Sequence, residues 1–429
     1  MLYEPDAAIA RRDPHLPGLA TLLDPEAFIE VLHRAAPGAN LQSVHPVYAK
    51  YTPGTNCLIG YRCRVNGNDI PIYAKAYPAG FVKKLIKARE KPGIAGPLGP
   101  GRLALDTLNT VVSVYPNDGK VKALPLITDQ KHREQGLRDV FPHEPALWDG
   151  AVRPLAYKPE RRLVARLDTH AGPQAVLKTY TRHGYEAPPQ VNQRFRSCGN
   201  LRLAPAIGRS DQYQTLAFGW LPGRVLSDAL LDPAFSSGEL ELVGAALAEL
   251  HNQEAEGLPI QTGAHVAKIL LAETGTLGML SPTIAPRAQV LAQKLAAHMA
   301  TSVPCNRPVH GDFHARQVLL DGKTAAILDL DQIFQGDPYH DLGFFLAHLE
   351  REVIRGRLAP ERVPTLRERF LAGYAATTGK PIASSHLNAY TSTILLRLAP
   401  RFFRCREADW PDRIERAVAR AEDLLAQDA

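Results

Sequence analysis

Residues 309–331 read VHGDFHARQVLLDGKTAAILDLD, and this stretch carries most of the information about the fold and chemistry of the chain. Two short apolar runs flank an Asp-Gly pair, which is the pattern of a β-hairpin. A four-residue loop at 321–324 would place Gln317 on the first strand opposite Leu328 on the second. The hairpin therefore predicts which side chains meet at its open end.

Three oxygen-bearing side chains are expected at that end. Asp329 leaves the second strand beside Gln317, and the loop that carries Asp312 lies close by. Such oxygens suit a hard, octahedral cation such as Mg²⁺, which takes one or two carboxylates and completes its shell with phosphate oxygens and water. An acid that accepts a hydroxyl proton, with a second acid and an amide that hold metal, is the set of groups that phosphoryl transfer requires.

The composition is that of an ordinary soluble globular protein, with 429 residues of which 45% are hydrophobic and 22% charged. This length predicts about two to four folded units. The sequence has neither the run of roughly 18 apolar residues that a membrane helix needs nor the apolar core of a signal peptide, so we expect a cytoplasmic protein without membrane contact. Five cysteines without a C-x-x-C pair argue against a disulfide framework or a zinc ribbon.

The net charge of +6, from 50 Lys+Arg against 44 Asp+Glu, is not concentrated in one segment. The densest basic region, residues 351–369, has glutamates among its arginines. This mixture predicts a solvated helical face rather than a nucleic-acid surface. We therefore expect no nucleic-acid partner.

The N-terminal half is rich in strands. A helix is predicted to begin at Pro25, with Asp24 as its N-cap. An antiparallel meander follows, and a similar one comes about a hundred residues later; the predicted strands are 47–51, 57–65 and 70–75, then 155–159, 163–167 and 175–178. The last strands of the two meanders end in Lys75 and Lys178. The repeat indicates either a duplication or two unrelated meanders that share common strand chemistry.

After Gln214 the pattern becomes mostly helical. Ser236 and Glu239 form a capping-box pattern at the start of one helix. Further helices are predicted at 285–299, 341–355, 363–378, 386–397 and 412–426. A strand-rich half followed by a helical half predicts the α+β class.

Several of these segments together resemble the aminoglycoside-phosphotransferase-like kinases, which are relatives of the protein kinases. The His310-Gly311-Asp312 loop with an amide five residues after the aspartate, and Asp329 after a hairpin, look like the catalytic loop and metal-binding segment of that family. The other matching segments are GDPYHDL at 336–342, LPG at 221–223, LAELH at 247–251 and FLAGY at 370–374. The resemblance runs from about residue 155 to residue 376.

The resemblance implies a role for each matching residue. Asp312 would be the catalytic acid that orients or deprotonates the substrate hydroxyl, and Gln317 and Asp329 would hold Mg²⁺. Lys178 would hold the α- and β-phosphates of ATP. Asp341 and His310 would brace the catalytic loop. The adenine site would be lined by Phe218, Gly219, Trp220 and Leu221.

It also implies a protein-kinase-like bilobal fold, with an antiparallel-sheet N-lobe at 151–222 and a mainly helical C-lobe at 223–429. Residues 1–150 exceed the usual family length. They would form an N-terminal α/β cap-like domain of the kind seen in maltokinases, and this domain is a possible duplicate of the N-lobe.

Two features depart from the family pattern. Gln317 stands where the family has asparagine, so its amide oxygen lies one methylene farther out. The glutamate that pairs with the lysine is not clear, because Glu186 is followed by Pro188 and Pro189. Lys75 is a second candidate for the phosphate lysine.

The implied function is transfer of the γ-phosphate of ATP, or of GTP, to a hydroxyl group of a small molecule such as a sugar, an aminoglycoside or another alcohol. The positive net charge favours a neutral or anionic acceptor such as a sugar. Two alternatives stay open. One is a pseudokinase that acts as a nucleotide-binding or protein-interaction module, although both Asp312 and Asp329 are retained. The other is a metallophosphoesterase, whose first metal motif the sequence GDFH at 311–314 also fits, although its later motifs are missing. The sequence does not indicate an oligomeric state.

Overall fold

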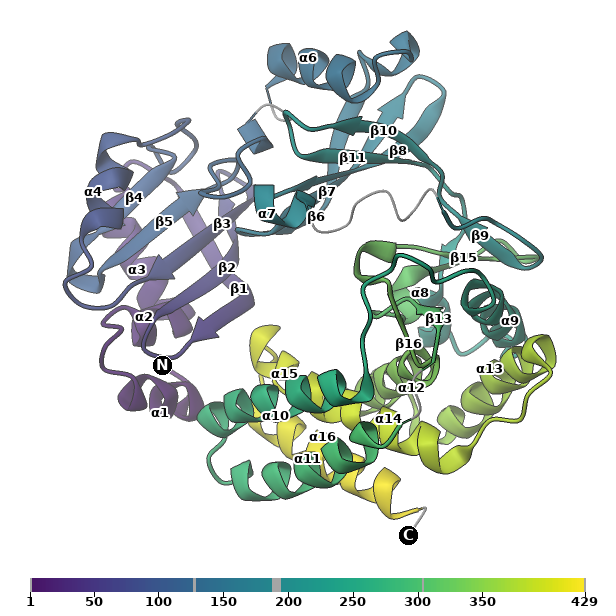
Figure 1. Ribbon diagram of the computed structural model, residues 1–429. Coiled ribbons are helices and arrows are strands. Elements are labelled where there is room, and N and C mark those ends of the chain that lie inside the picture. Colours follow the sequence, from purple (N-terminus) through teal and green to yellow (C-terminus); the bar gives the residue numbers. More distant parts are fainter. Residues whose placement is uncertain (1, 126–128, 187–193, 303–304, 428–429) are drawn as a thin grey trace. The chain divides into compact units, whose positions relative to one another are not determined.

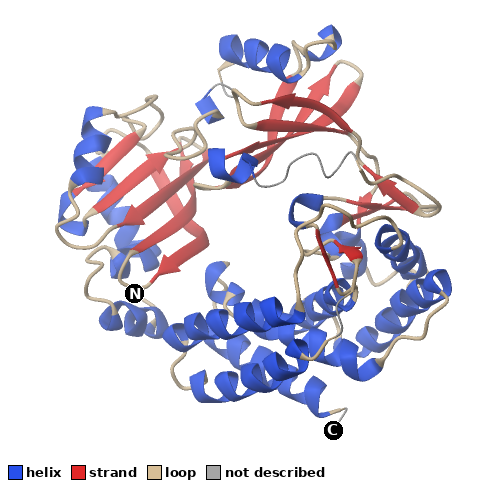
Figure 2. Ribbon diagram, in the orientation of Figure 1, coloured by secondary structure: helices blue, strands red, loops and turns tan. Residues whose placement is uncertain are grey.

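The computed structural model describes residues 2–125, 129–186, 194–302 and 305–427. Contacts within the chain divide it into two compact units, each drawn in Figures 1 and 2. The first unit consists of Met1–Glu186, Ile207–Phe218 and Arg401–Trp410, and the second of Ala187–Ala206, Gly219–Pro400 and Pro411–Ala429. None of the helices in the described ranges has the length and apolar character of a membrane-spanning segment.

The first unit begins with short helices that lead into an antiparallel sheet with the strand order β1-β2-β3-β5-β4. As predicted, Asp24 caps the helix that starts at Pro25, because its carboxylate accepts hydrogen bonds from the backbone N–H groups of Glu26 and Ala27. The elements are α1 (Glu4–Arg12), α2 (Leu19–Leu23), α3 (Pro25–Ala35), β1 (Leu41–Thr52), β2 (Asn56–Val65), β3 (Asn68–Ala76), α4 (Lys83–Glu90), β4 (Arg102–Leu105) and β5 (Thr110–Val114).

The turn between β2 and β3 shows how local sequence fixes the register of this sheet. Asn66 and Gly67 both have positive φ, at 52° and 76°, which the two-residue hairpin turn requires. Val65 then pairs with Asn68 and each later residue of β3 with its partner on β2. The predicted meander is therefore confirmed.

A second antiparallel sheet in the same unit has the order β10-β11-β8-β7-β6. Counted along the chain, both sheets have the order first, second, third, fifth, fourth. Helix α6 packs Leu137, Val140 and Phe141 against Leu167 and Leu177 of this sheet. The elements are α6 (Gln130–Val140), β6 (Ala151–Lys158), β7 (Arg162–Thr169), β8 (Gly172–Tyr180), α7 (Arg182–Glu186), β10 (Ala206–Ser210), β11 (Thr215–Gly219) and, near the C-terminus, α15 (Arg401–Arg404).

The second unit is mainly helical. Its core includes a cluster of three phenylalanines, Phe313, Phe345 and Phe370, in which each ring contacts the other two. Its helices are α8 (Leu226–Leu231), α9 (Glu239–His251), α10 (Gly263–Leu280), α11 (Ala285–Ala300), α12 (Tyr339–Ile354), α13 (Val363–Thr378), α14 (Ser384–Leu398) and α16 (Trp410–Ala426). Its strands are β9 (Leu201–Leu203), β12 (Arg224–Val225), β13 (Arg307–Val309), β14 (Val318–Leu320), β15 (Ala325–Ile327) and β16 (Phe334–Gly336).

The α+β class, with antiparallel sheets in one unit and mostly helices in the other, is confirmed. One local prediction is wrong, because α9 begins at Glu239 with Gly238 at the N-cap position and no side-chain cap, so Ser236 does not form a capping box. Helix α10 was not predicted, because its apolar residues are spread around the helix instead of forming one stripe. Pro188 and Pro189 lie outside the described residues.

Candidate active site

The predicted hairpin forms with the predicted register. Leu320 pairs with Ala325, and Val318 with Ile327. The backbone N–H of Leu328 donates to the carbonyl oxygen of Gln317 at 2.8 Å. The hairpin lies inside a sheet of order β12-β14-β15-β9, so both of its strands have a further neighbour. This pairing makes its open end a rigid support for side chains.

Gln317 and Asp329 meet at that end. Gln317 Nε2 donates to Asp329 Oδ2 at 3.4 Å. Asp329 has a φ of 66° and a ψ of 58°, in the left-handed region, which aspartate tolerates better than most residues. Non-glycine residues held in this region are concentrated at functional sites. The hairpin therefore brings together two of the three predicted oxygen donors.

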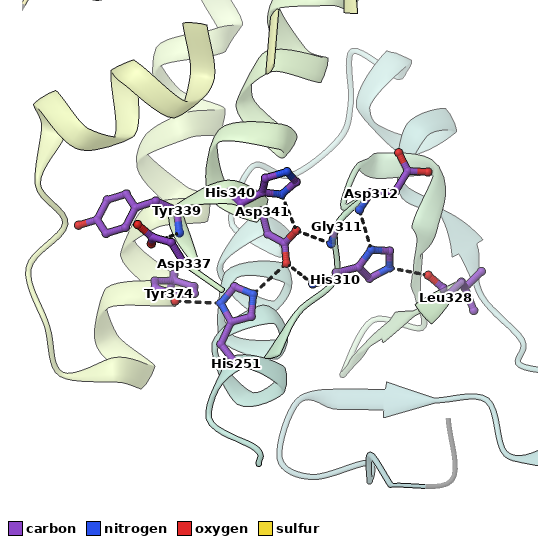
Figure 3. Close-up of polar contacts among 10 residues, drawn as sticks. All are labelled: His251, His310, Gly311, Asp312, Leu328, Asp337, Tyr339, His340, Asp341 and Tyr374. Atoms are coloured by element: carbon purple, nitrogen blue, oxygen red, sulfur yellow. Dashed lines mark hydrogen bonds and ion pairs between the residues drawn. The ribbon is translucent and has the colours of Figure 1, made fainter. Parts of the chain in front are cut away.

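Asp312 lies in the loop between β13 and the hairpin. The preceding Gly311 has a φ of 83°, and a Cβ at this position would lie 2.6 Å from the carbonyl oxygen of Gln332. The tight bend therefore requires glycine. The Asp312 side chain is about one-fifth exposed, and its carboxylate points away from the buried polar groups behind the loop (Figure 3). Its Oδ2 lies 3.9 Å from Nε2 of His314.

The fully buried Asp341, in the first turn of α12, holds this loop from behind (Figure 3). Its carboxylate accepts hydrogen bonds from the backbone N–H groups of His310 at 2.6 Å and Gly311 at 2.9 Å. It also lies 3.0 Å from Nε2 of His251, whose Nδ1 is 3.0 Å from the hydroxyl of Tyr374. These contacts confirm that Asp341 braces the loop that carries Asp312.

The environment of Asp341 favours its charged form. Complete burial opposes ionisation, but the imidazoles of His251, His340 and His310 outweigh it and hold the pKa of Asp341 well below its usual range. A carboxylate that stays charged keeps accepting both backbone N–H groups across the working pH range. The geometry of the loop therefore depends on the buried charge of Asp341 at the start of α12, which contacts His251 at the end of α9.

His310 ties the loop to the end of β15. Its Nδ1 accepts a hydrogen bond from the backbone N–H of Asp312 at 3.2 Å, so its Nε2–H donates to the carbonyl oxygen of Leu328 at 2.8 Å (Figure 3). Both ring nitrogens are thus engaged, and the side chain is buried. His310 is a positioning residue, as predicted, because it fixes Asp312 relative to the strand that precedes Asp329.

Lys178 and Phe218 lie in the first unit, on the neighbouring strands β8 and β11. The Lys178 side chain is 8% exposed, and its Nζ lies 5.2 Å from the centre of the Phe218 ring. The structure therefore brings these two predicted nucleotide-binding residues together. Lys75, the other lysine candidate, pairs instead with Glu160, with Nζ 2.6 Å from Oε2. Glu186, in α7, pairs with Arg182 at the surface.

The remaining predicted nucleotide-binding residues are Gly219 at the end of β11 and the two residues of the connector that follows it. The backbone N–H of Gly219 donates to the carbonyl oxygen of Pro205 at 2.8 Å, and a Cβ at Gly219 would lie 3.0 Å from that proline ring. Trp220 and Leu221 are each partly exposed. The connector is therefore anchored at the residue before it, and its first two side chains are accessible.

A polar cavity of about 380 Å³ in the second unit was not anticipated. It is lined by residues from three helices and the segments between them, which are His298, Thr301, Ser302, Cys305, Asp337, Tyr339 and His386. Asp337 Oδ2 lies 2.8 Å from Nε2 of His386, whose Nδ1 is 3.1 Å from Nε2 of His298. Burial and the neighbouring His386 lower the pKa of His298. Among these residues, Asp337 and Tyr339 carried a signal in the sequence, through their place in the GDPYHDL segment.

A family model matches the part of the chain that contains Lys178, Asp312 and Asp329. The model of the phosphotransferase enzyme family matches residues 152–383, more than half of the chain. No match is found among curated proteins.

Three solved structures that are similar to this chain are distant from it in sequence. The macrolide 2′-phosphotransferase of Brachybacterium faecium is 19% identical over 62% of this chain and 91% of its own, with a TM-score of 0.40. An aminoglycoside 2′-phosphotransferase in complex with GDP is 14% identical over 70% of this chain and 100% of its own, with a TM-score of 0.49. The choline kinase of Cryptosporidium parvum is 10% identical over 70% of this chain and 96% of its own, with a TM-score of 0.48.

Proposed function

Because this chain belongs to the phosphotransferase enzyme family, we propose that it transfers the γ-phosphoryl group of ATP to a hydroxyl group of a small molecule, with Mg²⁺. The observation that carries this proposal is the braced open end of the hairpin. There Gln317 and Asp329 are in contact, and the loop of Asp312 is fixed by Asp341 and His310. Phosphoryl transfer depends mainly on positioning and charge neutralisation, which a rigid constellation of this kind supplies.

The donor set at this end fits a magnesium ion. Gln317 and Asp329 offer an amide oxygen and a carboxylate, which are hard ligands. In the described part of the chain there is no group of three or more His, Cys, Asp or Glu side chains that could hold a metal ion. This accords with Mg²⁺, which commonly takes one or two protein ligands and completes its shell with phosphate oxygens and water. When bound, the ion would neutralise charge on the phosphate oxygens.

Asp312 acts on the acceptor. Its partly exposed carboxylate accepts the proton of the acceptor hydroxyl, while the hydroxyl oxygen forms a bond to the γ-phosphorus. The bond from that phosphorus to the β,γ-bridging oxygen breaks, and ADP leaves with the electron pair. Lys178 holds the α- and β-phosphates, and residues 219–221 line the adenine site. Each of these steps requires geometry rather than a covalent intermediate on the protein.

We propose that the acceptor binds in the cavity lined by His298, Asp337 and His386. Its lining residues carry polar groups, its volume of about 380 Å³ lies within the range of small-molecule sites, and Asp337 and Tyr339 belong to the segment that leads into Asp341. Asp337 is the one carboxylate among its described lining residues, and it already pairs with His386. A polycation would need several unpaired carboxylates. The lining therefore favours a neutral acceptor rich in hydroxyl groups, such as a sugar.

The catalytic role of Asp312 is tested by making the same Asp→Asn change at two positions, one in the loop before the hairpin and one in the hairpin turn. Asp312→Asn should lower kcat by about 10²–10⁴-fold, because it removes the proton acceptor while leaving the loop contacts of the backbone in place. Asp321→Asn changes an aspartate at the other end of the hairpin, where it caps the turn, and should leave kcat within about twofold. An Asp312→Asn enzyme with unchanged turnover on a panel of sugars and other alcohols would remove Asp312 from the mechanism.

Calorimetric titration with ATP separates the enzyme from a pseudokinase. We expect binding that requires Mg²⁺ and that weakens at least tenfold in Asp329→Asn, because this change removes the carboxylate ligand. Asp312→Asn should bind ATP as the wild type does. ATP binding without phosphoryl transfer to any hydroxyl acceptor, or to water, would support a nucleotide-binding module instead. A folded protein that binds no nucleotide would contradict the proposed function.

A further inference from the structure

The first unit contains a cavity of about 420 Å³ that the proposed phosphoryl transfer does not use. It lies over strands β3 and β5 and beside helix α4, and its apolar floor includes Tyr73, Tyr77 and Val111. Its lining is strongly basic. The six lysines that line it are Lys75, Lys84, Lys87, Lys91, Lys120 and Lys122, and Arg102 is the seventh cation among the described lining residues.

Helix α4 contributes the most unusual part of this lining. Lys84 and Lys87 in the helix and Lys91 at its C-cap follow each other at intervals of three and four residues, so they lie along one face of the helix. Ala88, on the same face, is buried against the sheet. Like charges at this spacing repel one another. The arrangement of three lysines toward one cavity therefore lowers the stability of the helix.

The two acidic residues of the lining are already engaged. Asp118 accepts hydrogen bonds from the backbone N–H groups of Lys120, Val121 and Glu160 and from the hydroxyl of Tyr157. Glu160 pairs with Lys75 at 2.6 Å and with Lys120 at 3.3 Å.

Four lysines of the cavity, which are Lys84, Lys87, Lys91 and Lys122, have no carboxylate within 4.0 Å in the described ranges. Seven cations against two engaged carboxylates leave a large positive potential in a concave site.

The rim of the cavity is built in advance. Asn117 is buried, and its side chain accepts from the backbone N–H of Ile94 at 2.7 Å and donates to the carbonyl oxygen of Ile94 at 2.9 Å. A Cβ at Gly93 or Gly101 would lie 2.2 or 2.3 Å from the Asn117 amide, so this loop can close only with glycine at both positions. The backbone N–H of Gly119 donates to the hydroxyl of Tyr73 at 3.0 Å. The loops that carry the cations are therefore fixed without a ligand.

We propose that this cavity binds a small molecule that carries phosphate groups, at a site separate from the phosphoryl-transfer centre. Phosphate is the anion that suits the site, because several ammonium groups can each donate to its oxygens, and the volume lies within the range of small-molecule sites. The apolar floor provides room for the organic part of the ligand. A concave site of this size does not match a nucleic-acid backbone, which binds along extended basic surfaces.

Calorimetric titration with inorganic pyrophosphate, without Mg²⁺ and at low salt, tests the proposal in the full-length chain. All proteins carry Lys178→Gln, so that the proposed nucleotide site contributes little. We expect Lys84→Gln/Lys87→Gln to weaken pyrophosphate binding at least tenfold. The matched control is Lys83→Gln, an exposed lysine of the same helix that does not line the cavity, and it should stay within twofold.

Further titrations, with a sugar phosphate, inorganic phosphate and duplex DNA, identify the class of ligand and test the location of the site. A sugar phosphate that binds more tightly than inorganic phosphate would support an organic ligand, and the reverse order would point to free phosphate at the same lysines. Equal affinities in the double variant and in Lys83→Gln, or no binding by the Lys178→Gln protein, would overturn the proposal. So would duplex DNA that binds through these lysines while pyrophosphate does not. Because these outcomes need no turnover, they are independent of whether the chain is an active kinase.

Discussion

The two sheets of the first unit share a plan but surround their lysines differently. Each is preceded by a helix of 11 residues, α3 or α6, and each has a helix, α4 or α7, after its third strand. Both have the strand order first, second, third, fifth, fourth. Lys178 lies nearly buried beside an aromatic ring, whereas Lys75 lies in a polybasic cavity and is paired with Glu160. A common topology has therefore been given two different sites.

The two sheets also share a β-bulge in their first strands, β1 and β6. The register of β1 against β2 shifts between Pro46 and Tyr48, and that of β6 against β7 shifts between Pro154 and Ala156. Each of these two bulges follows a proline, whereas a further shift in β1, between Leu41 and Ser43, does not. Bulges are features that families retain. We propose that residues 1–150 contain a second copy of the sheet at 151–222.

The bulges also show that the two lysines are not equivalent. In the second sheet, Ala156 directly after the bulge pairs with Val164, which pairs with Lys178 on the third strand. In the first sheet, Tyr48 directly after the bulge pairs with Gly60, which pairs with Tyr73 on the third strand. Lys75 lies two residues farther along β3. An offset of two residues keeps a side chain on the same face of a sheet. The two lysines therefore do not occupy equivalent positions in the two sheets.

Replacing each lysine in turn gives the largest expected difference between the sheets. Lys178→Met should lower kcat/KM for ATP by about 10²–10³-fold, because it removes a fixed positive charge from the phosphates. Lys75→Met should lower it by less than tenfold and should instead weaken pyrophosphate binding. Steady-state kinetics and calorimetry on both variants test the assignment. The reverse pattern would make Lys75 the nucleotide residue and would break the comparison.

How far the sequence predicts these features depends on the distance over which contacts form. The hairpin that joins Gln317 to Asp329 is local, so alternation and turn chemistry predict its register correctly. The Asp341 brace came from the family resemblance. The cavity between Asp337 and His386 and the one around Lys87 could not be predicted, because residues far apart in sequence form them. The lysine spacing in α4 is the one signal that could have indicated the second cavity.

The next largest effect is expected on the stability of the protein when Asp118, which connects the two sheets, is replaced. Asp118 is buried and receives three backbone N–H groups and the Tyr157 hydroxyl, so it links the turn after β5 to the turn between β6 and β7. Asp118→Asn should lower the free energy of unfolding by about 2–3 kcal/mol, because hydrogen bonds to a charged group are lost. Urea denaturation measures this change.

The control for Asp118 is Asp69→Asn, which alters an exposed aspartate of β3. It should change the free energy of unfolding by less than about 0.5 kcal/mol. Equal effects of the two changes would mean that Asp118 does not link the sheets.

Buried thiols in β2 distinguish the sheets at high pH. Burial raises the pKa of Cys57 and of Cys63 to about 12. When the two sheets are aligned at their bulges, the position of Cys63 in the first sheet is occupied in the second by Leu167, which has no ionisable group. A pKa raised by folding adds stability that is complete below the unfolded value of about 9 and is lost as the pH rises toward the folded value. Between pH 8 and pH 10, each thiol should lower the free energy of unfolding by about 1 kcal/mol.

Urea denaturation at several pH values tests this contribution. The double variant Cys57→Ala/Cys63→Ala should lose less stability between pH 8 and pH 10 than the wild type does, whatever its stability at pH 8. Cys405→Ala, which removes an exposed thiol, should keep the wild-type slope. A double variant with the wild-type slope would show that these thiols do not titrate during unfolding.

The smallest effect is expected at the bulges themselves, where the two sheets should respond alike. Val47 and Leu155 are the bulged residues, and their side chains are 48% and 53% exposed. Val47→Thr and Leu155→Thr should each change the free energy of unfolding by less than about 0.5 kcal/mol, because little apolar surface is lost and the backbone is unchanged. Val44→Thr, on the buried face of the same β1 strand, should cost more, since it places a hydroxyl among apolar side chains. A large loss at only one of the two bulges would show that they differ in structure and would weaken the case for duplication.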